Sequence, residues 1–162
     1  MASELHVDAI KHSGGTSAMT IDSSGRVLTP ARPSFYAFNL SFSGDGSAEE
    51  GTGGTIDHNI GSHYNSSNGR FTAPIAGVYQ FMASIQGFNS GSTTYVALIF
   101  NKNGTNYGPQ SALGYYNQTY NNHGQVNLTA LFNLNANDYI QLHASLNARN
   151  TTQNYFGGYL IG

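Results

Sequence analysis

Acidic side chains gather in one glycine-rich stretch of the chain. Asp45, Glu49 and Glu50 all lie within residues 44–54. Carboxylate oxygens on a flexible loop are ligands that Ca²⁺ prefers. A solvated acidic loop has the same composition, and the spacing here matches no standard calcium-binding loop. These three residues are therefore the candidates for a metal site, and no other cofactor is expected.

The histidines are scattered along the chain, and there is no cysteine that could serve with them as a nucleophile or metal ligand. They occupy positions 6, 12, 58, 63, 123 and 143. His58 and His63 are an odd number of residues apart, so a continuous strand would point them to opposite faces. Only a turn between them would bring both to one metal ion. No Gly-x-Ser-x-Gly elbow accompanies the many serines, so we predict that the protein is not an enzyme.

Tyrosines and amides alternate with one another in a second stretch, residues 115–123. A tyrosine ring offers a flat apolar surface to a sugar, and asparagine and glutamine amides can pair with sugar hydroxyls. A polar strand edge with half-buried tyrosines would have the same sequence pattern. The candidate glycan- or surface-binding residues are Tyr115, Tyr116, Asn117, Tyr120 and Asn122.

The charge of the chain is sparse. Among 162 residues, six Lys and Arg stand against eight Asp and Glu, for a net charge of −2. Phosphate binding needs clustered basic residues, so a nucleic-acid partner is not expected. Uncharged polar residues accompany 11 Tyr and 9 Phe, a mixture that favours strands and turns over helices. The length is that of one domain with an additional arm.

Export and membrane signals are missing from the sequence pattern. No apolar run approaches the roughly 18 residues of a spanning helix, so membrane insertion is not expected. The first residues, Met-Ala-Ser-Glu-Leu-His, lack the basic start and apolar centre of a signal peptide. With no cysteine in the chain, no disulfide stabilises it. We therefore expect synthesis in a cytoplasm without secretion.

Period-two alternation predicts the strands that must position these residues. The central strand follows Pro74 and Gly77, where a close approach of the backbone leaves no room for a Cβ. Its predicted core face consists of Tyr79, Phe81, Ala83 and Ile85. In residues 34–43 the apolar face, and hence the predicted core face, consists of Tyr36, Phe38, Leu40 and Phe42. In residues 125–133 it consists of Val126, Leu128, Ala130 and Phe132.

Further segments complete the predicted sheets. Residues 44–54 are expected to form a long loop, residues 56–60 an edge strand and residues 102–105 a turn. Residues 93–101 are apolar almost throughout, which predicts a strand buried on both faces. The last strands are expected at residues 138–145 and 155–161.

The spacing of six residues around the central strand carries a family resemblance. Those residues are Asn59, Tyr64, Phe71, Gly77, Tyr79 and Phe81. Their pattern resembles the signature of the C1q/tumour-necrosis-factor-like jelly roll, although the chain has Gly53 and Ala83 where the signature has aromatic residues. The Asp138-Tyr-Ile-Gln-Leu segment and the Phe156-Gly-Gly-Tyr-Leu ending are also similar to that family, with Asn137 in place of a usual glycine. The resemblance covers residues 34–162.

The resemblance implies an all-β fold and a three-fold assembly. The fold would be a C1q/TNF-like jelly-roll sandwich of about ten antiparallel strands, with a short extended or hairpin arm before it. A homotrimer would bury the surplus apolar surface of residues 95–100. The predicted trimer interface consists of Tyr95, Ala97, Ile99 and Tyr159.

The first 33 residues form the predicted arm. Short alternating segments flank the Ser23-Ser-Gly25 turn, and Pro30 and Pro33 stiffen the connection to the rest. Residues 7–28 resemble segments of tailed-bacteriophage structural proteins that precede an exposed fibre, knob or decoration domain. A flexible leader of a bacterial surface protein is the alternative. Because the arm is too short for its own core, we expect it to anchor or trimerise the protein.

Three functions follow from these observations, in order of preference. The first is a phage virion protein: a trimeric fibre tip, knob or capsid decoration that contacts other virion proteins through residues 1–33 and adheres to host-surface polysaccharide. The second is a secreted or cell-surface C1q-like lectin or adhesion module. An enzyme is the third.

Overall fold

A computed structural model describes residues 6–42, 49–88, 95–107, 113–115, 123–145 and 152–162. The chain divides into two compact units, Met1–Arg32 and Pro33–Gly162. Every strand pair in the described ranges is antiparallel, and these ranges contain no helix. No helix long and apolar enough to cross a membrane is therefore found in the described part of the chain. The predicted all-β fold class is confirmed.

The first unit is a three-stranded meander. Strands β1 (Ala9–Lys11), β2 (Ser17–Ile21) and β3 (Val27–Leu28) pair in that order. Gly25 has a φ of 76°, as the predicted turn requires, and the Asp22 carboxylate accepts hydrogen bonds from the backbone N–H groups of Ser24 and Arg26. The first strand begins later than the alternation of residues 5–10 predicts.

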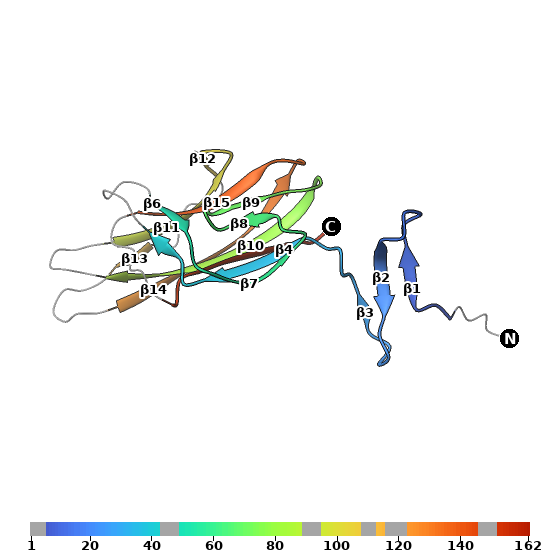
Figure 1. The fold of residues 1–162 in the computed structure, drawn as a ribbon. Helices are drawn as coiled ribbons and strands as arrows, with labels where there is room; N and C mark the ends of the chain where they lie inside the picture. The colour runs from blue at the N-terminus through green and yellow to red at the C-terminus, as the bar shows by residue number, and fades with distance from the viewer. Residues whose placement is uncertain (1–5, 43–48, 89–94, 108–112, 116–122, 146–151) are drawn as a thin grey trace. The chain divides into compact units, whose positions relative to one another are not determined.

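The second unit contains a five-stranded sheet and an eight-stranded sheet among the described residues (Figure 1). The five-stranded sheet has the order β14-β10-β16-β4-β7, with bounds His123–Leu134, Gly77–Phe88, Tyr155–Leu160, Ser34–Phe38 and Thr55–Ile60. The other sheet has the main path β12-β11-β15-β6-β5, with bounds Thr105–Asn106, Tyr95–Lys102, Tyr139–Ser145, Glu49–Thr52 and Ser41–Phe42. It is completed by β8 (Tyr64–Asn65), β9 (Arg70–Thr72) and β13 (Leu113–Tyr115).

Aromatic rings fill the space between the two sheets. Phe81 of β10 lies at their centre, with ring centroids 5.4 Å from Phe71 and 6.1 Å from Phe100, which belong to the opposite sheet. Within its own sheet it lies 5.7 Å from Phe132 and 5.9 Å from Phe156. The predicted inward faces of the central strand and of residues 125–133 are confirmed, because their residues are buried in this core or packed against it.

The predicted core face of residues 34–43 is wrong in its first half. Phe35 and Ala37 are buried, whereas Tyr36 and Phe38 point to the other face of β4 and are half-buried. Asn39 then adopts a left-handed φ of 59°, which shifts the alternation so that Leu40 becomes buried, as predicted. Both faces of the segment are aromatic, so alternation alone could not identify the inner one.

Two other segment predictions also change. The stretch expected to be a loop at 44–54 contains β6, which pairs with β5 and β15. The segment 93–101 contributes to β11, whose bounds are Tyr95–Lys102; Leu98 and Phe100 are buried, whereas Ala97 and Ile99 are half-buried on its outer face, so the described part of this strand is not buried on both faces. The edge strand β7 and the turn after Lys102 lie where the sequence predicts them.

Candidate functional site: the outer face of the five-stranded sheet

Aromatic side chains gather on the outer face of the five-stranded sheet. Side chains alternate along a strand, so the neighbours of the buried core residues point away from the core. On β4 these are Tyr36 and Phe38, with ring centroids 6.3 Å apart. On β16 they are Tyr155 and Tyr159, and the Tyr155 ring lies 5.6 Å from that of Tyr36. Two adjacent strands thus present four aromatic rings outward.

A glycine lets one of these rings lie close against the sheet. Gly157 is paired with Tyr36 and lies between Tyr155 and Tyr159 on the same face. A Cβ at Gly157 would lie 2.9 Å from Cδ2 of Tyr36, closer than carbon atoms normally approach. The absence of a side chain at this position therefore makes room for the Tyr36 ring.

Neighbouring strands extend this surface without adding charge. Met82 of β10 is paired with Gly157, and Leu131 of β14 is paired with Gln80. Leu131 is 63% exposed, the largest value among the large hydrophobic residues whose side chains the structure describes. We call the surface formed by these six side chains the aromatic face: Tyr36, Phe38, Met82, Leu131, Tyr155 and Tyr159. Strands β14, β10, β16 and β4 carry no Asp, Glu, Lys or Arg.

Uncharged hydrogen bonds hold the polar groups of this surface in place. The Tyr159 hydroxyl donates to Oε1 of Gln80 at 2.7 Å, and Nε2 of Gln125 donates to Oγ of Ser84 at 2.8 Å. Burial raises the pKa of Tyr36, and the neighbouring Tyr155 and Asp57 raise it further. The phenol of Tyr36 is therefore neutral at physiological pH, and the surface is suited to contact another uncharged surface.

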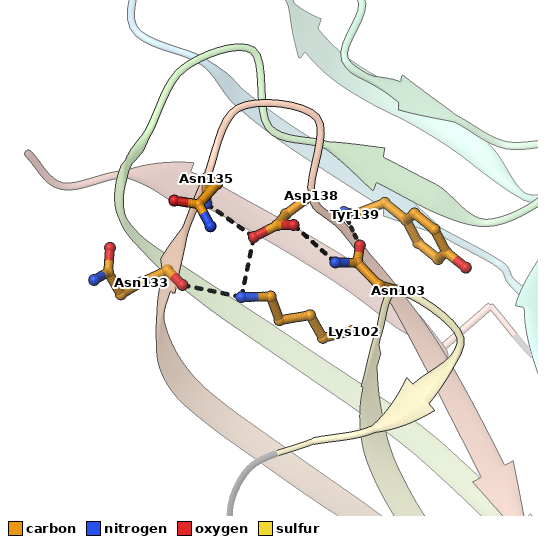
Figure 2. A network of polar contacts seen from close by, with 6 residues as sticks. All are labelled: Lys102, Asn103, Asn133, Asn135, Asp138 and Tyr139. Atoms are coloured by element: carbon orange, nitrogen blue, oxygen red, sulfur yellow. Dashed lines mark hydrogen bonds and ion pairs between the residues drawn. The ribbon is translucent and has the colours of Figure 1, made fainter.

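A polar network closes the turn between β14 and β15 (Figure 2). The Asp138 carboxylate accepts hydrogen bonds from Nδ2 of Asn103 at 2.7 Å and the backbone N–H of Asn135 at 2.8 Å, and it lies 3.0 Å from Nζ of Lys102. These contacts, of which the hydrogen bond from Asn103 has the largest effect, lower the pKa of Asp138 to about 2. Because its oxygens already have protein partners, we interpret Asp138 as part of a structural connection.

A histidine lies on the outer side of β15, in the other sheet. The His143 side chain is only 12% exposed, and neither ring nitrogen has a hydrogen-bond partner among the described residues. Its Nε2 lies 3.9 Å from Oε1 of Glu50, and its strand partner on β11 is Ile99. Burial lowers the pKa of His143, and the Glu50 carboxylate opposes that shift. The ring is therefore favoured in its neutral form.

The predicted metal ligands do not assemble in the described part of the chain. Asp45 and the side chain of Glu49 lie outside the described residues, and Glu50 is beside His143. His58 contacts the Asp57 carboxylate, whereas the His63 ring packs against Phe71. No group of three or more His, Cys, Asp or Glu side chains that could hold a metal ion occurs among the residues described.

The predicted glycan-binding residues fall almost wholly outside the described ranges. Tyr115 ends strand β13, but its side chain is not described. Tyr116, Asn117, Tyr120 and Asn122 lie in the undescribed segment 116–122. Sugar binding by these residues stays a prediction.

The predicted trimer-interface residues lie in two different sheets. Ala97 and Ile99 are on the outer side of β11, and only the backbone of Tyr95 is described there. Tyr159 belongs to the aromatic face of the five-stranded sheet. Ala97 and Ile99 therefore lie on a different sheet from Tyr159, and the role of the four residues in a trimer stays a prediction. Tyr36 and Phe38, which join Tyr159, were assigned to the core by the sequence pattern.

These features define the second unit as an antiparallel jelly-roll sandwich with an aromatic core and, on four strands of one sheet, an outer face without charged residues. A C1q domain model matches residues 35–161. Among solved structures, the globular domain of zebrafish complement 1qA protein has a TM-score of 0.59 and 17% identity, with 81% of this chain and 98% of that chain covered. Murine APRIL has a TM-score of 0.60 and 10% identity, with 80% and 99% covered. A search of curated protein sequences found no match.

The chain therefore belongs to the C1q domain family. At these identities the solved structures establish the likeness of fold alone. The resemblance on which the sequence-based fold prediction relies is confirmed for the jelly roll.

Proposed function

We propose that this protein is a self-associating C1q-type head that acts by binding rather than by catalysis, and that three copies assemble through the aromatic face. The supporting observation is the aromatic face itself, on which six large side chains gather without a charged residue on their strands. Contiguous apolar surface with such a composition marks sites of protein association. The family resemblance of the sequence implies a three-fold arrangement.

The physical gain from assembly comes from covering this surface. Leu131 of this face is 63% exposed, and Val78, which is two residues from Gln80 on β10 and therefore points the same way as Met82, is 38% exposed. Complete burial of an aliphatic side chain contributes on the order of 1.5–3 kcal/mol, so these partly exposed residues would contribute less than that each. The tyrosines add broad contact area and can direct their hydroxyls to a polar rim, as tyrosines at interfaces do.

Light scattering on purified protein tests the assembly, with two matched substitutions. The parent chain should have about three times the protomer mass of 17.3 kDa. Leu131→Glu would put a carboxylate on the aromatic face and should convert the protein to monomer at micromolar concentration. Leu131 is exposed in the single chain, so its substitution should leave the head folded by circular dichroism.

Ile99→Glu is the competing variant. It adds the same charge to the outer side of β11, which carries Ala97 and Ile99 of the interface predicted from the sequence. A trimer that persists in Ile99→Glu supports the aromatic face as the interface. Dissociation by Ile99→Glu and not by Leu131→Glu would show that the interface is at β11 and not at the aromatic face. A monomeric parent would refute self-association.

The finer proposal is that the head belongs to a virion. We propose a fibre tip, knob or capsid decoration because residues 7–28 resemble segments of phage structural proteins. Mass spectrometry of purified particles should detect the chain, and its absence would remove this function in favour of a C1q-like adhesion module. Weak glycan binding would be lost in a variant with Tyr115, Tyr116 and Tyr120 changed to Ala, without a change in scattering mass.

A further inference from the structure

The apolar side chains of the N-terminal meander lie on one face. Residues directly opposite each other in antiparallel strands share a face, and so do residues two apart in one strand. Ile10 is opposite Met19, and Ile21 is opposite Val27. Met19 and Ile21 are two residues apart on the central strand β2. We call these four residues the arm face.

The arm face is uncovered within its own unit. Ile10 and Val27 are 52% and 57% exposed, and Met19 and Ile21 are 37% and 41% exposed. The opposite face presents Ala9, Thr20 and Leu28, with Leu28 as its one large aliphatic residue. A meander this small cannot bury an apolar face against itself, so the arm face needs a partner from outside the unit.

From this arrangement we infer that the arm face packs against the same face of sister chains, so that three meanders form a second apolar core in the assembled protein. This inference rests on the proposed trimer. None of the four arm-face side chains is charged, and the charged Lys11, paired with Ser17 after a register shift, lies at the edge of this surface. The charged Asp22–Arg26 pair is at the hairpin turn beyond the strand ends, with Nε of Arg26 2.7 Å from Oδ2 of Asp22.

Covalent connection favours sister chains over an unrelated partner. Only the segment Thr29–Pro33 separates β3 from β4, and it contains two prolines. In a trimer of heads, such short connections keep the arms at an effective concentration of the order of millimolar. Association that would be weak between separate chains then becomes favourable, and the assembled protein acquires a second interface.

The absence of cysteine from the parent chain makes a thiol test specific. Ala18 and Met19 are adjacent, exposed residues of β2; Met19 belongs to the arm face, whereas Ala18, at the register shift opposite Ile10 and Lys11, does not. Two full-length variants, Met19→Cys and Ala18→Cys, are oxidised with copper phenanthroline and separated on a denaturing non-reducing gel. Around a three-fold axis two thiols pair and the third is left over, so a linked dimer with residual monomer is expected for Met19→Cys. It should form at least about tenfold faster than for Ala18→Cys.

Light scattering on the same samples separates this inference from the proposed function. A trimeric mass with rapid linkage of Met19→Cys and slow linkage of Ala18→Cys supports packed arms. A trimeric mass with equal linkage rates, or with no linkage of Met19→Cys, overturns the inference while leaving the trimer of heads. A monomeric mass overturns the proposed trimer and the inference with it.

A second measurement does not depend on thiol geometry. The full-length double variant Ile10→Ser and Val27→Ser keeps the strand hydrogen bonds but removes apolar surface. Hydrogen exchange of the β2 amides should become about tenfold faster or more, while the trimeric mass is retained. Unchanged exchange in β2 would overturn the packing of the arm face.

Discussion

Asp138 connects three segments of the second unit. It contacts Lys102 at the end of β11, Asn103 in the turn after it, and the backbone of Asn135 before β15 (Figure 2). Oδ1 of Asn103 in turn accepts a hydrogen bond from the backbone N–H of Tyr139 at 2.8 Å. A carboxylate with lowered pKa stabilises the fold above its unfolded pKa, and that contribution is lost as pH falls toward the folded value. The stabilising contribution of Asp138 is therefore present above its ordinary pKa of 3.8 and is lost as pH falls from 3.8 to about 2.

Replacing Asp138 by Ala should lower the free energy of unfolding at pH 7 by roughly 1–2 kcal/mol, a value reduced from that of buried pairs because water screens the site. Urea unfolding at one fixed protein concentration measures it. The parent and variant should approach each other as pH falls from 3.8 toward 2, where Asp138 becomes protonated in the folded chain as well. Asp57→Ala is the control, because Asp57 is 64% exposed. Equal losses in both variants would contradict the role of the network.

His143 should also make the fold less stable as pH falls, although it is a base and Asp138 is an acid. Its pKa is lowered by burial, so the unfolded chain binds the proton more readily than the folded chain. The stability contribution is present above the ordinary value of 6.5 and decreases as pH falls below it. In urea titrations, His143→Leu should show a shallower loss of stability between pH 6.5 and pH 5 than the parent. A parallel pH profile would mean that the neutral ring is not what this site requires.

At the scale of elements, left-handed residues decide where strands end. Asn103 and Gly104 have φ values of 51° and 84°, which suit the tight hairpin between β11 and β12. Asn137 has a φ of 72° in the turn before β15. The C1q-like motif that the sequence resembles usually has glycine at this position, and the backbone conformation gives the reason. Asparagine tolerates this region better than other residues with a side chain.

Asn137 therefore permits a paired test. Asn137→Gly should leave the free energy of unfolding within about 0.5 kcal/mol, whereas Asn137→Ala should lower it by about 1 kcal/mol because alanine is strained at this φ. Thermal and urea unfolding of both variants measure the difference. Asn135→Ala controls for loss of an asparagine side chain in the same turn. If the Gly and Ala variants were equally stable, backbone strain would not explain this position.

At the scale of the whole molecule, the proposed assembly is held by uncharged surfaces. The aromatic face and the arm face are formed by uncharged side chains, and the charged Asp57 that raises the pKa of Tyr36 belongs to the edge strand β7. Screening by salt weakens contacts between exposed charges but leaves apolar burial in place. Assembly should therefore depend little on ionic strength.

Analytical ultracentrifugation at two salt concentrations tests this expectation. Between about 0.05 M and 0.5 M sodium chloride, the dissociation of the trimer should change by less than roughly threefold. Ion-pair interfaces weaken much more over this range, so marked dissociation at high salt would point to the charged edge of β7. The Leu131→Glu variant supplies the monomer reference for the sedimentation profiles.

The sequence by itself determined the strands with one clear apolar face. Tyr79, Phe81, Ala83 and Ile85 could be assigned to the core because polar or smaller residues alternate with them. The turns at Gly25 and Asn103 could be predicted because local sterics restrict which residues adopt a left-handed backbone. The family-like spacing around Phe71 and Gly77 gave the jelly roll, since it reflects packing that this fold requires.

Where both faces of a strand are aromatic, only the tertiary structure decided which one is buried. It also brought together polar groups that are distant in the sequence. Phe35 is in the core and Tyr36 is outside because β16 offers Phe156 on one side and the vacant surface of Gly157 on the other. Likewise, β6 forms because β15 and β5 pair with its backbone, and its Gly-rich sequence does not predict this pairing. Asp138 finds Lys102 and Asn103 only when β11 and β15 pair. Such choices depend on which surface a neighbouring strand presents, and local alternation carries no information about that neighbour.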